Sequence, residues 1–281
     1  MKATGIQVIR RPTLDDPRIL IALFLLMYDG YALWWRSFYR SPQQWAATVS
    51  VCVVLDFALC YYRRRKFLVP FSGLITAFGI LLLCDSPFVW TYVFVAAASI
   101  LSKHFITSDG KHIFNPSNFG LVLGMLFFSQ YMVSDPTRWA NSLKGLAVIG
   151  PLGLLLAYRA NRLPLCAAWV GTYILCAPIL GAISGAPMLL YVAPVTGAAF
   201  NLFTFYMITD PATSPSAPRD QVICGALIAI VDAVFRGFRF FEAPFFASFI
   251  VCGCWPTLSR TRAWVSGSLK AVSLDPAPSR P

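Results

Sequence analysis

Two polar segments, each bordering a long apolar stretch, contain the residue types that could bind a ligand. The first reads SKHFITSDGKHIFNPSNFG and includes Asn115-Pro116. Proline suits the first turn of a helix, and an asparagine before it can cap the exposed backbone N–H groups. Such a helix start, with Lys103 and Lys111 nearby, suits an anionic ligand or a polar ring. A solvated loop that merely caps a helix would have the same composition, so both interpretations stay open.

The second polar segment reads FYMITDPATSPSAPRDQ. Asp210-Pro211 and Ser214-Pro215 force an extended or turning chain, because the residue before a proline avoids the helical region. The alternative to a binding segment is an elaborate turn with a helix cap. The candidate binding residues of both segments carry hydrogen-bonding or charged side chains. They are Lys111, His112, Asn115, Asn118, Thr209, Asp210, Thr213 and Ser214.

Three acids, Asp29, Asp56 and Asp232, fall inside apolar stretches rather than at their ends. A charged carboxylate in hydrocarbon is costly, so each should face the protein interior, pair with a base or stay protonated. The functional interpretation is an ion or proton path. The structural interpretation is a pair with arginine or with backbone and hydroxyl donors, and the sequence does not decide between them.

No metal site is expected from the sequence. The eight cysteines lie in or beside apolar stretches, as small buried hydrophobic residues do, rather than in the polar loops of a disulfide scaffold. A zinc site takes about four ligands, and the chain has only two histidines, His104 and His112. The same scarcity argues against a haem with paired histidine ligands.

The composition is that of a membrane protein. Of the 281 residues, 57% are hydrophobic and 12% are charged, and the mean hydropathy is +0.64. Soluble domains carry roughly 25% charged residues, so most of this chain should face lipid. The net charge of +11 then indicates basic loops on one face of a membrane rather than binding of nucleic acid.

Apolar stretches cut by charges, prolines and glycines predict an all-α chain with about ten transmembrane helices. The predicted spans are 18–36, 43–62, 67–84, 88–102, 117–133, 143–158, 165–183, 188–208, 221–240 and 243–258. They form a single membrane domain over 18–258. Residues 1–17 are expected to be a polar segment without a removable signal peptide, and 259–281 a polar, disordered tail.

The distribution of basic residues predicts the orientation. With both termini on one side, that side holds 17 Lys and Arg and the other holds 6. The positive-inside rule then places both termini in the cytoplasm of a bacterial inner membrane. An odd number of spans would scatter this bias.

The spacing of four prolines suggests an internal repeat. Pro87 and Pro116 are 29 residues apart, as are Pro215 and Pro244, with an offset of 128 between the pairs. Each proline lies at a matching span boundary of two five-span halves, and an odd number of spans per half makes the second half inverted. Inverted repeats with proline-interrupted helices usually hold a site near the repeat interface.

The strings FNPSNFG and MITDPATSP, the latter followed by GALIAIV, resemble the RnfD/NqrB family of membrane subunits. These are subunits of the Rnf electron transport complex and of the sodium-pumping NADH:quinone oxidoreductase. The resemblance covers about Lys103 to Ile250. The DPR tripeptide and the string from SKHFI to NPSNFGLVL are also similar to short RnfD-like proteins found with enediyne biosynthesis genes.

The resemblance implies a ten-helix inverted-repeat fold that holds flavin (FMN or riboflavin) and passes electrons within the membrane, together with redox partner subunits or a reductase. In the family, a covalent FMN is attached to the last Thr of a Ser-Gly-Ala-Thr type motif. The nearest strings here end in Pro187 and Ala199, so a non-covalent flavin is expected. The alternatives are a permease for a small molecule or ion, and a biosynthesis-accessory membrane scaffold without cofactor.

Overall fold

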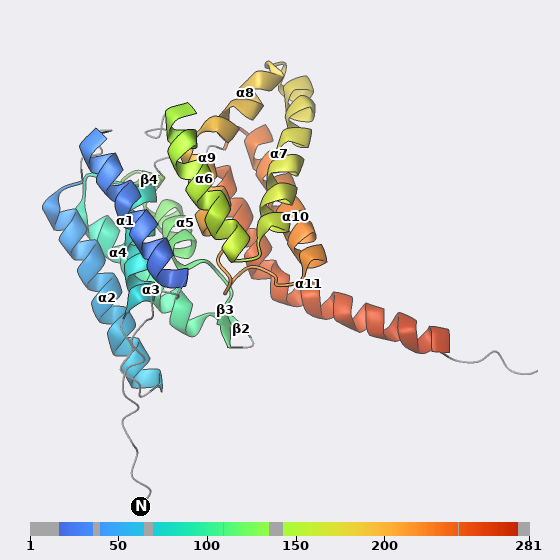
Figure 1. Ribbon diagram of the computed structural model, residues 1–281, viewed down its shortest axis with the longest axis horizontal. Helices are drawn as coiled ribbons and strands as arrows, with labels where there is room; N and C mark the ends of the chain where they lie inside the picture. The colour runs from blue at the N-terminus through green and yellow to red at the C-terminus, as the bar shows by residue number, and fades with distance from the viewer. Residues whose placement is uncertain are drawn as a thin grey trace, which may run out of the picture.

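The computed structural model describes residues 17–35, 40–64, 70–108, 110–134, 143–240 and 242–274, and these are almost entirely helical (Figure 1). The helices are α1 (Pro17–Trp35), α2 (Pro42–Arg64), α3 (Phe71–Leu83), α4 (Val89–Phe105), α5 (Pro116–Phe128), α6 (Leu143–Arg159), α7 (Leu163–Ser184), α8 (Met188–Val192), η1 (Ala193–Thr196), α9 (Ala198–Leu202), η2 (Phe203–Met207), α10 (Pro218–Gly237) and α11 (Ala243–Leu274). The predicted all-α class is confirmed.

Two short antiparallel strand pairs mark opposite ends of the bundle. β2 (Thr107–Ser108) pairs with β3 (Lys111–His112) between α4 and α5, whereas β1 (Cys84–Asp85) pairs with β4 (Val133–Ser134) at the other ends of these helices. We call the first the His112 end; it also contains 208–217. The second is the Glu242 end, because Glu242 accepts a hydrogen bond there from the backbone N–H of Ser134 at 3.1 Å.

The helices expose apolar side chains to an extent that suits lipid. On α7, Leu175, Ile179 and Ile183 are 60–75% exposed. By length and composition, Pro42–Arg63 and Leu163–Ser184 are each able to cross a membrane, and the other apolar helices of the described residues are shorter. The number of ten spans therefore stays a prediction.

The segment predicted as one span over 188–208 is instead broken into α8, η1, α9 and the π-helix η2. Pro194 lacks a backbone N–H, and Gly197 is extended at φ −80° and ψ 145°, so a continuous ladder of helical hydrogen bonds cannot form. The segment is therefore helical but interrupted, and its crossing of the membrane as one span stays a prediction.

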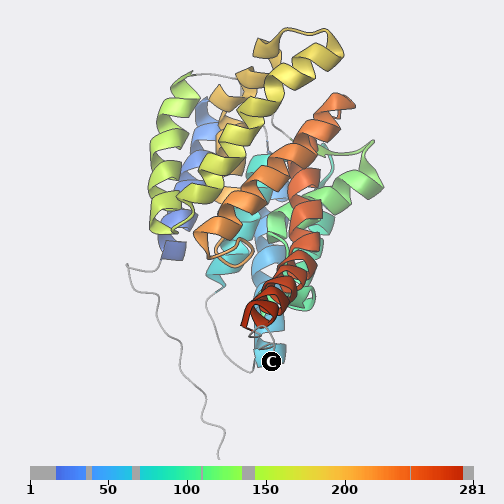
Figure 2. The ribbon, with the colours of Figure 1, turned by 90° about the vertical axis from the view of Figure 1, so that its right-hand side faces the viewer.

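The last helix also differs from expectation, since α11 continues to Leu274 instead of giving way to an irregular tail after 258. Pro256 lies inside it, and no further proline follows before Pro276, so nothing in the local sequence forces the helix to end. Figures 1 and 2 show this final part leaving the bundle.

The two halves of the chain pack in a similar order. In the first, α1 packs on α3, α2 on α3 and α4, and α4 on α5. In the second, α6 packs on α9, α7 on α8 and α10, and α10 on α11. This is the order that a five-plus-five repeat predicts, and the inverted repeat itself stays a prediction.

Small residues allow the closest helix approaches. A Cβ atom at Gly120 of α5 would clash with the Val95 carbonyl oxygen of α4, and one at Gly225 of α10 would clash with the Leu165 carbonyl oxygen of α7. Within a membrane, such close backbone contact is a main source of helix association, because lipid provides no hydrophobic drive between helices. These contacts fix the helices that carry the candidate site.

Candidate functional site

The two polar segments, about ninety residues apart in sequence, meet at the His112 end. The Nε2 atom of His112 on β3 lies 3.3 Å from Oδ2 of Asp210, which follows η2. Nearby, Nδ2 of Asn115 donates to the carbonyl oxygen of Met207 at 3.3 Å. The structure thus places the predicted residues of both segments side by side.

Asn115 and Asn118 have structural roles at the start of α5. Asn115 Oδ1 accepts a hydrogen bond from the backbone N–H of Asn118 at 3.2 Å, which caps the helix ahead of Pro116. The Asn118 side chain is buried and its Nδ2 donates to the carbonyl oxygen of Phe245 in α11 at 3.1 Å. Its Oδ1 is buried without a hydrogen-bond partner among the described residues.

The second segment is a turn built around Asp210. Its Oδ1 accepts from the Ala212 N–H at 3.0 Å, and its carbonyl oxygen accepts from the N–H of Ser214 at 2.9 Å and from the Thr213 N–H at 3.1 Å. The hydroxyls of Thr213 and Ser214 donate to the same carbonyl, and the Thr209 hydroxyl donates to the carbonyl oxygen of Phe205. These three hydroxyls therefore stabilise the turn, leaving Asp210 as the acid at its outer edge.

Arg162 reinforces this turn from the α6–α7 connection. Its Nε donates to Ser214 Oγ at 2.6 Å, and the guanidinium also donates to the carbonyl oxygens of Ala160 and Asn161. Burial lowers the pKa of Arg162 from its usual value, and the negative charge of Asp210 opposes that shift. The sequence interpretation missed Arg162, which lies 48 residues before Asp210 in the chain.

The accessible part of the site is the edge formed by Lys111, His112 and Asp210. Lys111 is exposed, and the side chains of His112 and Asp210 are 18% and 21% exposed. From inside the bundle, a cavity of about 50 Å³ reaches Asn115 and is bordered by Gly79 and Tyr206. Pockets for small molecules span roughly 300–1,000 Å³, so a flavin ring does not fit this cavity.

Neither position that matches the family's attachment threonine offers a hydroxyl. Pro187 precedes α8, and Ala199 lies within α9. A phosphoester link requires a hydroxyl, so neither residue can form one.

Two of the three intramembrane acids are paired with bases. Asp56 Oδ1 lies 2.7 Å from Lys103 Nζ and 2.8 Å from His104 Nε2. Asp232 Oδ2 lies 2.7 Å from Arg236 Nε. The Asp232 contact is the arginine pair that the structural interpretation names, whereas Asp56 contacts a lysine and a histidine instead.

Unpaired oxygens distinguish the three acids further. Asp29 is buried, and within the described residues its Oδ2 has no hydrogen-bond partner. The same holds for Oδ1 of Asp232. Asp56 is different, because two bases from α4 contact one of its oxygens.

A cluster of potential metal ligands was missed by the sequence analysis. Asp56, Cys60 and His104 place one ligand atom each within 4.8 Å of one another. The sequence signal was the four-residue spacing of Asp56 and Cys60, which puts both on one face of a helix. Their proximity to His104 depends on packing of α2 against α4, which the sequence pattern does not specify.

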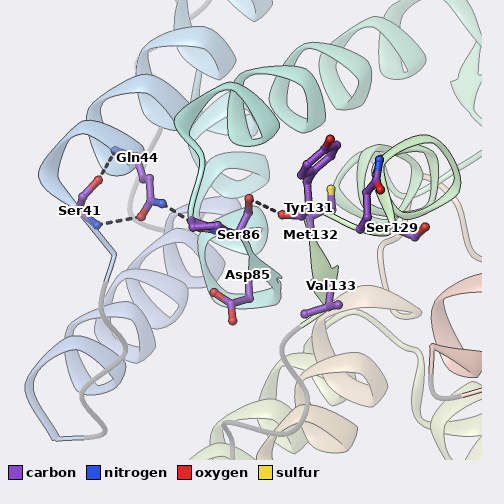
Figure 3. Close-up of a pocket in the computed structure, with 10 residues that line it drawn as sticks. Ser41, Gln44, Asp85, Ser86, Ser129, Tyr131, Met132 and Val133 are labelled. Carbon is purple, nitrogen blue, oxygen red and sulfur yellow. Dashed lines mark hydrogen bonds between the residues drawn. The ribbon is translucent and has the colours of Figure 1, made fainter.

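A larger pocket of about 580 Å³ lies at the Glu242 end, far from the predicted site (Figure 3). Gln44 bridges two of its walls, since its Oε1 accepts from the Ser41 N–H at 2.8 Å and its Nε2 donates to the Ser86 carbonyl oxygen at 2.9 Å. Ser86 Oγ donates to the carbonyl oxygen of Tyr131 at 2.7 Å. Asp85, on another wall, is paired with Arg40 at 2.8 Å. Hydrogen bonds thus cross-link the polar residues of the pocket wall, which apolar side chains such as Pro87, Met132 and Val133 complete.

The helical fold and apolar surface define an α-helical membrane protein. Residues 141–264 match the model of the NQR2, RnfD, RnfE family. This match is consistent with membership of the RnfD/NqrB family and confirms the resemblance predicted from the sequence. It includes the Asp210 turn, while His112 and the α5 start lie before it. No curated protein sequence matches the chain.

Proposed function

We propose that this chain is a membrane subunit of an electron transport complex of the RnfD/NqrB type. The observation that carries the proposal is the hydrogen bond from Asn115 Nδ2 to the Met207 carbonyl oxygen. It joins the two motifs that resemble this family, the second of them inside the matched residues. The chain has no nucleotide-binding or iron–sulfur motif. Its electrons must therefore come from a redox partner subunit or a reductase.

The proposed ligand is a non-covalent flavin, FMN or riboflavin, lying against the edge of Lys111, His112 and Asp210. When bound, a flavin supplies one- and two-electron transfer. Lys111 would oppose the negative charge of a phosphate or of a reduced ring, since charge-assisted hydrogen bonds are the stronger ones, and His112 would add a hydrogen-bonding ring nitrogen. Asp210 would orient the His112 ring, and Arg162 would keep the Asp210 turn in place.

The flavin occupancy of purified variants tests whether flavin binds at the edge of Lys111, His112 and Asp210. Asp210→Ala and His112→Ala are expected to lose bound flavin, because each removes a group of the edge. Asn115→Ala should lose it as well, since it removes the cap of α5. Gln130→Ala, at the Glu242 end, is the matched control and should keep its flavin. Full flavin occupancy in all three site variants would show that flavin binds elsewhere in the protein.

We also propose that the chain lies in the bacterial inner membrane with both termini, and the His112 end, in the cytoplasm. This orientation would present the Lys111 edge to cytoplasmic partners. Reporter fusions after Lys111, after Arg219 and at the C-terminus should all report cytoplasm. A C-terminal fusion reporting the outside would exclude an even number of spans.

An ion or proton path along Asp29, Asp56 and Asp232 is a separate part of the proposal. Asp29 and Asp232 are favoured, because each keeps a buried oxygen without a hydrogen-bond partner within the described residues. Asp232→Asn should then slow the electron-transfer turnover of the complex, while the amount of folded protein stays the same. Unchanged turnover in both Asp29→Asn and Asp232→Asn would leave these acids with structural roles only.

The second candidate function is a permease, favoured by the pocket of about 580 Å³ at the Glu242 end. Its hydroxyl, amide and carboxylate groups, set beside Pro87, Met132 and Val133, suit a small solute with both polar and apolar parts. Uptake into vesicles without a redox donor would favour this function over electron transfer. Absence of both flavin and uptake would favour a scaffold without cofactor.

A further inference from the structure

Three potential metal ligands converge between α2 and α4, near the His112 end. Asp56 and Cys60 are one helical turn apart on α2, and His104 lies in the last turn of α4. Their ligand atoms lie within 4.8 Å of one another, with Cys60 Sγ 4.0 Å from Asp56 Oδ1. The side chains of Asp56 and His104 are only 3% and 5% exposed, so packing holds both in place.

The position of Asp56 is fixed by a close helix contact. A Cβ atom at Gly73 of α3 would lie 2.9 Å from the Cys52 carbonyl oxygen and 3.3 Å from Asp56 Oδ2. The backbone of α3 therefore presses directly against the α2 turn that carries the carboxylate. Such support from neighbouring atoms is what a preorganised metal site requires.

A cation already neutralises this carboxylate. Lys103 Nζ lies 2.7 Å from Asp56 Oδ1, while 13% of the Lys103 side chain remains exposed. Lysine has a long flexible side chain and lies in the last turn of α4, so its ammonium group can turn toward solvent. Lys103 thus holds a place that a metal ion would take.

We propose that Asp56, Cys60 and His104 form a site for a divalent metal ion of the zinc class, with Lys103 as a competing cation. Thiolate, imidazole and carboxylate are the ligand types that zinc binds, and three protein ligands leave a fourth position for water. Bonds of about 2.0–2.3 Å in a tetrahedral site place ligand atoms about 3.3–3.8 Å apart. The 2.8 Å contact between Asp56 Oδ1 and His104 Nε2 must therefore lengthen by about 0.5 Å on metal binding. Cys60 Sγ, 4.0 Å from Asp56 Oδ1, must move slightly closer, which rotation of its half-buried side chain can supply.

Cobalt titration of the detergent-purified full-length protein, kept reduced, tests this site. Co²⁺ bound to a thiolate gives a charge-transfer band in the near ultraviolet, and this band should saturate at one ion per chain and disappear when Zn²⁺ is added. The Cys60→Ser variant should lose the band, and His104→Ala should bind Co²⁺ at least tenfold more weakly. Cys254→Ser, which changes an exposed cysteine, is the matched control and should keep the band.

Lys103 supplies the sharper test. If its ammonium competes with the metal, Lys103→Met should bind Co²⁺ at least tenfold more tightly than the wild type. A purely structural ion-pair cluster predicts no saturable binding in either protein. Absence of saturable Co²⁺ binding to the folded wild type, or an unchanged band in Cys60→Ser, would overturn the proposal. Unchanged or weaker binding by folded Lys103→Met would overturn the role of Lys103. Flavin content does not enter this test, so it stands or falls independently of the proposed function.

Discussion

The two halves of the chain neutralise their buried acids in different ways. In the first, Asp56 of α2 contacts Lys103 and His104 of α4, so the charges link two helices. In the second, Asp232 and Arg236 form a pair within α10, and the Arg236 guanidinium lies over the Tyr173 ring of α7, with its Cζ 3.8 Å from the ring centroid. The 128-residue offset between the proline pairs aligns His104 with Asp232. The acid thus lies on α2 in the first half and on α10, the counterpart of α4, in the second, while the base stays on that counterpart. Among the described residues, only the first arrangement gathers metal-ligand types.

The largest expected effect comes from Asp56→Ala. This change leaves Lys103 and His104 without their carboxylate, and breaking a buried pair by removing one partner costs about 3–5 kcal/mol. Because Lys103 can turn toward solvent, we expect the lower end, about 3 kcal/mol. Denaturant-induced unfolding in detergent micelles measures it. A loss of stability no larger than that of the partly exposed control Asp220→Ala, in the first turn of α10, would show that the α2–α4 link is not stabilising.

Asp232→Ala should lower the free energy of unfolding by about 2 kcal/mol, which is less than the loss in Asp56→Ala. The smaller loss is expected because the Tyr173 ring still attracts the Arg236 cation. A double change, Asp232→Ala with Arg236→Leu, should recover most of the loss, since no buried charge remains. The same unfolding assay applies. If the double variant is less stable than the single one, the pair itself stabilises the fold and the comparison fails.

At the candidate site, Asp210→Ala should weaken flavin binding by on the order of 1–3 kcal/mol, the cost of one lost buried hydrogen bond. Flavin fluorescence of the dialysed protein, titrated with FMN and with riboflavin, measures the change. Asp85→Ala, a carboxylate at the Glu242 end, is the control. Equal losses in both variants would indicate general destabilisation rather than a local contact.

The smallest effect concerns pH and the Glu242 end. Burial raises the pKa of Glu242, and its hydrogen bonds from Ser134 partly oppose the shift. The folded protein therefore holds this proton more tightly than the unfolded chain, so stability should fall as pH rises from the usual glutamate pKa through the raised one. Glu242→Gln should flatten that part of the stability profile. A wild-type profile that rises over this window would contradict the assignment.

The sequence predicted those helices whose ends carry clear markers. The predicted spans 18–36 and 143–158 agree with α1 and α6 to within a residue, because prolines or charges border them. The break in 188–208 was missed, since an apolar composition hides the effect of Pro194 and Gly197 on hydrogen bonding. The continuation of α11 was missed because polar residues were taken as a sign of an irregular tail.

For the candidate site, the two polar segments could be identified from the sequence. Their packing in the structure then shows which of the predicted residues stabilise the turn and which lie at its accessible edge. Thr209, Thr213 and Ser214 were predicted as ligand-binding residues from their type, yet their hydroxyls donate to backbone carbonyls. Whether a hydroxyl faces a ligand or its own turn depends on backbone geometry, which residue type does not specify. The Asp56 cluster depends in the same way on the register between α2 and α4.

We propose above that this membrane protein, which resembles the RnfD/NqrB family, binds flavin non-covalently. The most direct test of this proposal is the flavin content of the detergent-purified wild-type protein before and after denaturation. We expect a yellow, fluorescent protein whose flavin is released completely on denaturation and passes through a size-exclusion filter. A fluorescent band that stays with the polypeptide in denaturing electrophoresis, or a purified folded protein without any flavin, would contradict it.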